Sequence, residues 1–361
     1  MTDTYFTSNL VMKGWALDLF HLAQTENYMS RFTGKDKNSI IMEKTELNKN
    51  KGDSLVVGLM ADLNGAGIRG DSTLIGNEER LYNFTDTVTI DQIRNAVRLK
   101  GKMEEQRAAY NLRKEAKEGL KNWWVKFWQN CIFCHLAGDT TTNTMVADFP
   151  AVGIAPSADH IIYGGDATSD GTIAAGCHFT TQEIDRAVAK AKTYINSSTS
   201  AAPKSNIRPV LVKGKEYYVC IIHPYQLYTL RRDPAWLAAQ QNAGPRTEDN
   251  PIFSGMEGVW NGVVIHSHDQ IPLYTTWGGD GATQGARALF LGAQAAIVGK
   301  TGEPFWEEDT TSSSADFGNK PAFAVGCITG IKKTIFNSVD FGVIVMDTYA
   351  PTPSGSVHST P

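Results

Sequence analysis

An acidic, glycine-punctuated segment lies directly before a basic segment with helical periodicity, and this order limits how the chain can fold. Residues 52–93 carry seven acidic and two basic side chains, a net charge of −5, whereas residues 94–126 carry ten basic and four acidic ones, a net charge of +6. The acidic segment is too polar to pack against itself. Because complementary charges steer partners and fix their register, we expect it to lie on the basic segment of a second copy of the chain. The alternative is that both segments are solvated and their opposite signs are chance.

Eight charged residues are candidates for this contact between copies. They are Asp53, Asp71, Glu78 and Glu79 on the acidic side and Arg94, Arg98, Arg107 and Arg113 on the basic side. Contacts between exposed charges weaken as the salt concentration rises. Reversing charges on one side should therefore weaken the contact, and reversing both sides should partly restore it.

The acidic segment reads as a hairpin-like arm and the basic segment as a long helix. Alternating apolar residues predict strands over 54–61 and 84–91, and the glycines between them predict a looping connection. Apolar residues at three- and four-residue steps predict one helix over Lys102–Leu136, roughly 50 Å long. The first half of this helix is polar on most faces and the second half is apolar nearly all round. We therefore expect one end to be buried and the other half-exposed.

Two helix starts further along the chain have capping signals. Thr180 with Glu183 predicts a capping box. Asp233 followed by Pro234 predicts an N-cap and a first helical position. The remainder is rich in strands and shows no alternation of strands with helices, so the predicted fold class is α+β.

The composition excludes several classes of protein. A hydrophobic fraction of 42% and a charged fraction of 20% are typical of a globular chain with a sizeable core, in one large or two ordinary domains. A formal net charge of −4 argues against a dedicated nucleic-acid binder. Five scattered cysteines indicate a reducing compartment rather than a disulfide framework. The first 22 residues lack the features of a signal peptide, and no apolar run is long enough to predict a membrane span.

Several motifs resemble sites of chemistry but lack the context that the chemistry needs. Cys131–His135 has the CxxCH spacing of haem attachment, yet both cysteines continue the apolar stripe of the predicted helix. We interpret them as buried small hydrophobic residues, with a redox or zinc role as the alternative. Gly65–Gly70 has the letters of a dinucleotide fingerprint, but no helical pattern follows, which favours a flexible loop.

Two further motifs are also incomplete. His266 and His268 could share a strand face and bind a metal, but no third ligand is near in sequence. Asp166–Gly171 resembles part of a calcium loop, yet its twelfth position is Cys177 rather than glutamate. The sequence therefore predicts no catalytic, cofactor-binding or metal-ligating residues, and no cofactor. A thiol enzyme that uses Cys131 and Cys134 remains the alternative from a different class.

Short motifs in a fixed order resemble the major capsid protein family of Enquatrovirus-type (N-four-like) tailed bacteriophages. They extend over nearly the whole chain. They are Lys51–Asp53, Gly70–Asp71, Gly76–Glu79, Ile90–Gln92, Gln106–Arg107 with Leu112–Arg113, Ile222–Pro224 with Gln226, Leu230, Asp233 and Trp236, Asn250–Gly255, Leu291–Ala295 and Asp340–Gly342.

This resemblance implies the Hong Kong 97 capsid fold. It implies an N-terminal arm over 1–51, an extended loop over 52–101, a spine helix and the first part of a peripheral domain over 102–199, an axial domain over 200–272, and a return to the peripheral domain with a C-terminal tail over 273–361. The implied function is self-assembly into hexamers and pentamers of an icosahedral shell around double-stranded DNA, without enzymatic activity. The implied partners are other copies of the chain, scaffolding, portal and decoration proteins, and the packaged DNA, with no membrane. The shell would be assembled in the cytoplasm of a bacterial host. Another virion component, such as a decoration or tail protein, is the alternative.

Overall fold

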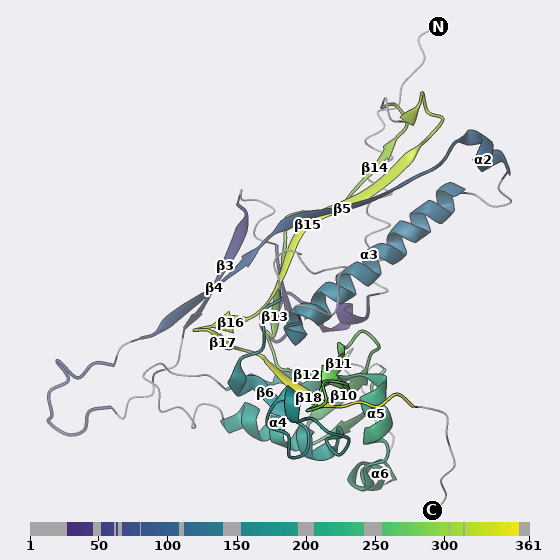
Figure 1. Cartoon of the computed structure of the whole chain (residues 1–361). Helices are drawn as coiled ribbons and strands as arrows, with labels where there is room; N and C mark the ends of the chain where they lie inside the picture. Colours follow the sequence, from purple (N-terminus) through teal and green to yellow (C-terminus); the bar gives the residue numbers. More distant parts are fainter. Residues whose placement is uncertain are drawn as a thin grey trace, which may run out of the picture.

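The computed structural model shows an elongated molecule with a lower body and a long upper extension (Figure 1). It describes residues 27–45, 52–60, 63, 67–79, 81–107, 112–139, 153–193, 206–241, 255–302, 304–312 and 315–353. The predicted N-terminal arm thus lies mostly outside the described residues, as do Gly65 of the glycine-rich motif and the residues between 194 and 205.

The predicted hairpin-like arm is confirmed. Strands β3 (Ser54–Met60) and β4 (Asn83–Thr89) pair antiparallel, from Ser54 opposite Thr89 to Met60 opposite Asn83. Leu55 and Val88, which stand opposite each other in the pair, are buried at the base of the hairpin. The connecting residues 67–79 form turns and extended chain, and no helix begins there. This finding agrees with the interpretation of the glycine-rich motif as a loop.

A single residue, Ile90, separates β4 from β5 (Asp91–Arg98). Figure 1 shows the two strands as one almost continuous ribbon that runs from the arm into the upper extension. There β5 pairs with the long strand β15 (Ala322–Lys333) over eight residue pairs. At the crossing, Gly330 of β15 faces Thr89 and Ile90 so closely that any Cβ there would clash with the Thr89 carbonyl. Glycine at this position lets the two strands meet.

The sheet around β15 has six strands. Beside β5 it contains β1 (Thr33–Gly34), β2 (Ile41–Lys44), β13 (Ala296–Lys300) and β14 (Phe305–Asp309), in the order β1-β2-β13-β15-β14. A short hairpin of β16 (Ile335–Phe336) and β17 (Val339–Asp340) follows β15. Because β5 and β15 are more than 200 positions apart, this sheet pairs segments that are distant in the sequence.

The prediction of one helix over Lys102–Leu136 is wrong in that two separate helices cover this range, and residues 108–111 between them lie outside the described part of the chain. The structure has two helices, α2 (Lys102–Arg107) and α3 (Leu112–Ala137). The first has no buried residue, so no apolar face ties it to the second. The predicted gradient along α3 is confirmed, because only scattered positions of its first turns are buried, whereas all of residues 131–137 are.

The lower body is built on an eight-stranded sheet. Its strands are β6 (Ile161–Tyr163), β7 (Val210–Val212), β8 (Lys215–Ile222), β9 (Gly258–Trp260), β10 (Val263–Ser267), β11 (Leu273–Trp277), β12 (Thr283–Leu291) and β18 (Val343–Tyr349). The main order is β6-β18-β12-β8-β10-β9, with β11 paired to β12 and β7 to β8. One connection runs from strand through helices to a parallel strand, since β10 pairs parallel with β8 after α5 (Pro224–Leu230), α6 (Pro234–Gln241) and β9, which is compatible with the predicted α+β class. These helices have seven and eight residues, too few to show a clear helical period.

The two faces of this sheet bury different clusters. Along β8, Val219 and Ile221 belong to a cluster that contains the second half of α3 and the 3₁₀ helix η1 (Tyr28–Phe32). Tyr218, Cys220 and Ile222 alternate with them and pack in a cluster with α4 (Thr181–Thr193) and α5. This period of two follows from the pleat of a strand. The second half of α3 therefore connects the lower body to the six-stranded sheet.

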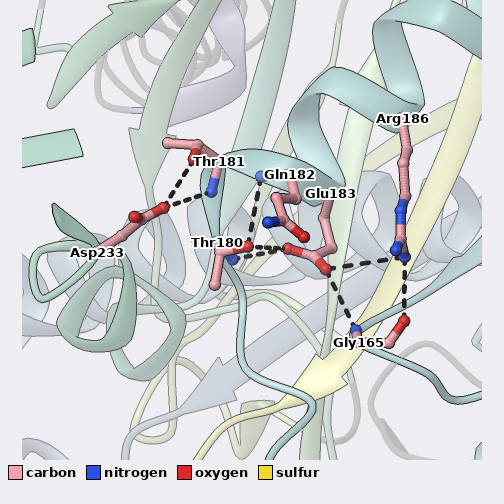
Figure 2. Close-up of polar contacts among 7 residues, drawn as sticks. All are labelled: Gly165, Thr180, Thr181, Gln182, Glu183, Arg186 and Asp233. Carbon is pink, nitrogen blue, oxygen red and sulfur yellow. Dashed lines mark hydrogen bonds and ion pairs between the residues drawn. The ribbon is translucent and has the colours of Figure 1, made fainter. Parts of the chain in front are cut away.

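The start of α4 confirms the predicted capping signal (Figure 2). The Thr180 amide donates to the Glu183 carboxylate at 2.9 Å, and the Thr180 hydroxyl oxygen accepts from the Gln182 amide at 3.3 Å. Glu183 is only 1% exposed, and it also accepts from the Gly165 amide at 3.2 Å. Arg186 lies 4.0 Å from the same carboxylate and donates to the Gly165 carbonyl. One buried glutamate thus joins the helix cap to the loop after β6.

The cap of α6 is joined to that of α4. Asp233 accepts from the Ala235 amide at 3.0 Å, which confirms it as the predicted N-cap. Its other carboxylate oxygen accepts from the amide and the hydroxyl of Thr181, at 2.9 and 2.7 Å (Figure 2). Asp233 therefore holds the N-terminal ends of α4 and α6 together.

A buried ion pair joins two neighbouring strands of the eight-stranded sheet. Arg287 of β12 and Asp347 of β18 stand directly opposite each other. The guanidinium donates through Nε and Nη2 to the two carboxylate oxygens at 2.8 and 2.7 Å. It also donates to the Ala137 carbonyl at the end of α3. Asp170, at the start of the 3₁₀ helix η4 (Asp170–Thr172), lies 4.0 Å away. A further 3₁₀ helix, η3 (Ala158–His160), precedes β6.

Candidate assembly interface

The four candidate acids lie on the arm and are exposed. Asp53 is at the start of β3, where its carbonyl accepts from the Ile90 amide. Asp71, Glu78 and Glu79 lie on the connecting loop, in which every residue from 71 to 79 is exposed. The Glu78 carboxylate accepts from the Gly76 amide at 2.8 Å and so stabilises a turn within the loop. The acids are thus spread from the base of the arm to its loop.

The four candidate bases lie on the upper extension. Arg94 and Arg98 are exposed residues of β5. Arg107, in α2, lies 3.5 Å from Glu104 of the same helix. Arg113, at the start of α3, lies 3.0 Å from Glu105 and 3.3 Å from Glu308 of β14. These pairs tie α2, α3 and β14 of one chain together. Arg113 remains 46% exposed and can still be approached from outside.

Within one chain the acids of the loop lie far from Arg107 and Arg113, whereas Asp53 at the base of the arm lies close to the start of β5. Figure 1 shows the hairpin and its loop at the left and α2 at the upper right, with β5 running between them. The structure therefore places the acids of the loop far from α2 and from the start of α3. Their complementarity points to a contact between copies.

The arm also exposes apolar side chains, which the charge pattern did not reveal. They are Val56, Met60, Leu63, Ile68, Leu74, Ile75 and Leu81. Exposed apolar groups gathered on one projecting element mark an interaction surface. The sequence did contain a signal, because leucine and isoleucine occur in a loop that lacks the strand or helix pattern that would place them in a core. The arm therefore exposes both acidic and apolar side chains.

The base of the arm is fixed by one buried carboxylate. Asp86 of β4 accepts from the Lys332 ammonium group of β15 and, at 2.9 Å, from the Ile335 amide of β16. Lys332 also donates to the Thr87 carbonyl at 3.1 Å. Nearby, Leu55 and Val88 pack against Met42 and Ile297 in a small apolar cluster. The direction of the arm is thus set by an ionic and an apolar contact together.

The cysteines of the haem-like motif are buried, in agreement with their interpretation as small hydrophobic residues. Cys131 and Cys134 lie in the same cluster as Phe133 and Leu136. Burial raises the pKa of the Cys134 thiol to about 12, with a contribution from nearby Asp139, and burial raises the pKa of Cys131 well above its usual value. Both thiols are therefore protonated at neutral pH, the unreactive form.

Thiol labelling tests this burial. We expect Cys134 of the native protein to react with a water-soluble disulfide reagent at pH 8 about a thousandfold more slowly than a free cysteine, because its thiolate fraction is lower by about three orders of magnitude. The rate is followed by the absorbance of the released thiol, and the unfolded protein in denaturant is the control. Rapid native labelling at Cys131 or Cys134 would contradict the burial and revive the thiol-enzyme alternative.

The two histidines lie in an aromatic environment rather than on one strand face. His266 is the fourth residue of β10, whereas His268 comes after the strand ends. Tyr28 lies edge-on to His266 and tilted against His268, at 6.1 and 4.5 Å between ring centres, and Phe133 stacks on His268. In the part of the chain that the structure describes, no group of three or more His, Cys, Asp or Glu side chains is arranged to hold a metal ion. Among the same residues, no helix has both the length and the apolar character needed to cross a membrane.

Comparison with known proteins places this architecture in a family. The model of the family described as "Phage capsid protein" matches residues 3–352. The chain belongs to the phage capsid protein family. This capsid protein is 31% identical to the major capsid protein of Pseudomonas phage KPP25, over 91% of this chain and 93% of that relative.

Solved capsid structures share the fold. The capsid of Ralstonia phage GP4 is 34% identical and matches with a TM-score of 0.79, over 91% of this chain and 93% of that one. The capsid of cyanophage Pam1 matches with a TM-score of 0.72 over 89% and 92% of the two chains, and at 21% identity this likeness concerns the fold alone. The predicted α+β fold of the Hong Kong 97 type is confirmed.

The predicted function is confirmed at the same level. The chain is a major capsid protein of a tailed phage, a structural component that assembles into a capsid shell and is located in the virion capsid. The segment boundaries and the eight charged contact residues remain predictions.

Proposed function

We propose that this capsid protein forms the hexamers and pentamers of an icosahedral shell around double-stranded DNA, and that the arm of one subunit lies on the upper extension of its neighbour. The observation that carries the contact is the separation of charge, with acids on the arm and bases on β5, α2 and the start of α3. Since Arg113 already pairs with Glu105 and Glu308, the neighbour's acids would join an existing network instead of binding isolated bases.

A charge-reversal series tests this contact. In the variant Arg107→Glu with Arg113→Glu, we expect shells to form only at about five- to tenfold higher protein concentration, because each exposed pair contributes up to about 1 kcal/mol. Adding Asp71→Lys and Glu79→Lys to the same chain should partly restore assembly. Sedimentation velocity with negative-stain microscopy gives the fraction of protein in shells.

The matched control is Lys213→Glu with Lys215→Glu, which changes the net charge equally at the exposed turn between β7 and β8. This control should assemble like the unmodified protein. Normal assembly of the Arg107 and Arg113 variant, or no recovery in the fourfold variant, would show that these charges do not form the contact.

Finer features of the function belong to the same proposal. The ordered motifs from Lys51–Asp53 to Asp340–Gly342 support a place among Enquatrovirus-type phages and the division into arm, extended loop, spine, peripheral and axial segments given above. Scaffolding, portal and decoration proteins would be its other partners, and assembly would take place in the bacterial cytoplasm. The mild negative charge of the chain suits a wall that encloses DNA without binding it tightly or by sequence. The buried thiols support a structural role without catalysis.

A further inference from the structure

Two histidines follow neighbouring parallel strands at the same edge of the lower sheet. His223 comes directly after β8 and His268 directly after β10, and these two strands pair in parallel. The His268 amide donates to the Ile222 carbonyl at 3.0 Å, which joins the two strand ends. His223 is 5% exposed, and the side chain of His268 is 14% exposed. Two titratable rings are therefore placed at one edge of the sheet with little access to water.

The His223 ring is the N-cap of α5. Its Nδ1 atom accepts a hydrogen bond from the Tyr225 amide at 3.1 Å. The His223 amide donates to the Gln226 side chain at 2.9 Å, and this buried glutamine also donates to the Thr348 hydroxyl of β18. N-caps are most often Ser, Thr, Asp or Asn, whose side-chain oxygen accepts a hydrogen bond. A histidine nitrogen accepts one only while it carries no proton, so the start of α5 depends on the protonation of His223.

His268 holds the turn after β10 in the same way. Its Nδ1 atom accepts from the Gln270 amide at 3.1 Å. The carboxylate of Asp269, whose side chain is 83% exposed, lies 3.1 Å from the same Nδ1 atom. The amide requires a nitrogen without a proton, whereas the carboxylate attracts a protonated one. His268 therefore has two alternative partners, one for each protonation state.

In the described part of the chain, the charged groups that act on the two rings are Asp269 and Arg31. Burial lowers the pKa of His223 to about 4, and Asp269 opposes this effect. Burial also lowers the pKa of His268, with Asp269 opposing the shift and Arg31 of η1 adding to it. Both rings are therefore neutral at pH 7 and take up protons in acid.

Aromatic side chains pack against both rings. Tyr225 lies edge-on to His223, at 4.6 Å between ring centres. Tyr28 of η1 and Phe133 of α3 contact His268, at 4.5 and 4.8 Å between ring centres. Phenol and phenyl groups gain no charge as the pH falls. Asp269 is therefore the group that attracts a protonated ring at this edge.

We propose that His223 and His268 form an acid-operated switch at this edge of the lower sheet. While neutral, the two rings hold the backbone at Tyr225 and Gln270. Once protonated, they release these amides and turn toward the Asp269 carboxylate, which frees the start of α5 and the turn after β10. The switch lies within one chain and does not depend on the proposed contact between copies.

The direction of the pH dependence follows from proton linkage. A histidine whose pKa is lower in the closed form than in the open form stabilises the closed form above about pH 6.5, and this stability is lost as the pH falls toward the pKa of the closed form. For His223 the pKa is about 4 in the closed form, against the ordinary value of 6.5 in the open form. The opening equilibrium of α5 should therefore be about twentyfold larger at pH 5 than at pH 7.

Amide hydrogen exchange of the full chain measures this opening. After correction for the intrinsic exchange rate at each pH, exchange over residues 223–230 should be about twentyfold faster at pH 5 than at pH 7. His223→Asn keeps an acceptor for the Tyr225 amide at every pH. This variant should abolish the rise over residues 223–230 and keep a rise over residues 268–270. No rise in the unmodified chain, or the same rise over α5 in His223→Asn, would overturn the switch.

Two further variants separate the switch from a general effect of acid. His178→Asn removes another half-buried histidine, whose pKa is also lowered by burial and which packs against Tyr349. It should leave the rise over residues 223–230 unchanged. Asp269→Asn removes the exposed carboxylate that favours both protonated rings, so the rise should move to lower pH in both segments. Loss of the α5 rise in His178→Asn, or a rise at unchanged pH in Asp269→Asn, would contradict the switch.

Discussion

Arg287→Met is expected to lower the free energy of unfolding by about 3–5 kcal/mol, because it leaves a buried carboxylate without its partner. Asp347 is 0% exposed, and two hydrogen bonds to Arg287 satisfy its two oxygens. The pair joins neighbouring strands in the middle of the eight-stranded sheet, and Arg287 also reaches the end of α3 at Ala137. Urea unfolding of unassembled subunits measures the change.

The pH dependence of the variant identifies the cause. Burial raises the pKa of Asp347 to about 6, against the opposing effect of Arg287. A carboxyl group whose pKa is higher in the folded than in the unfolded state stabilises the fold below about pH 4, and this stability is lost as the pH rises through the folded pKa. Removal of Arg287 raises the folded pKa further, so the destabilisation should be smaller at pH 5 than at pH 8.

The double variant Arg287→Met with Asp347→Leu is the control for lost packing. It should recover much of the stability, because no buried charge remains. Equal destabilisation at pH 5 and pH 8, with no recovery in the double variant, would mean that the ion pair is not what holds these strands.

Asp86→Ala should release the arm at its base and lower the free energy of unfolding by about 2–3 kcal/mol, since the Lys332 ammonium group and the Ile335 amide lose their shared acceptor. The hairpin keeps its own ladder, but its direction is no longer fixed against β15 and β16. We expect faster amide hydrogen exchange over residues 83–89, together with irregular or incomplete shells.

Asp91→Ala is the matched control. Asp91 is an exposed acid of β5, and its carboxylate accepts a hydrogen bond from the amide of the neighbouring Gln92. It should change neither amide exchange nor shell shape. Unchanged exchange over residues 83–89 in Asp86→Ala would show that the apolar cluster of Leu55 and Val88 is sufficient to hold the arm.

Features that depend on nearby residues could be predicted from the sequence. The alternation of β3 and β4, the buried second half of α3, and the caps at Thr180 and Asp233 are set by residues within a few positions of one another. The acidic and basic surfaces were visible as runs of charge. The fold as a whole followed from resemblance to a family and not from these local patterns.

Features that depend on distant pairing could not be predicted. The partner of β5 lies more than 200 positions away, and the alternation of β5 itself is weak because its residues are exposed or half-buried. Lys332, the ion-pair partner of Asp86, is likewise remote in the sequence. No sequence pattern near Arg287 indicates that Asp347 lies opposite it in the sheet. The exposure of Leu74 and Ile75 had a signal in the sequence, a loop without periodicity, but that signal does not show which surface covers them.

The near-continuity of β4 and β5 has a mechanical consequence. Only Ile90 separates them, and β5 is bonded to β15 along eight residue pairs. Since the hydrogen bonds of an antiparallel ladder are perpendicular to the strands, tension along the arm shears all of them at once and does not open them one by one. Hydrogen bonds that are loaded together in shear resist a larger force than hydrogen bonds that are broken one after another. If the shell encloses DNA and a neighbour holds the arm, as proposed above, outward pressure would be carried along the arm into the sheet around β15.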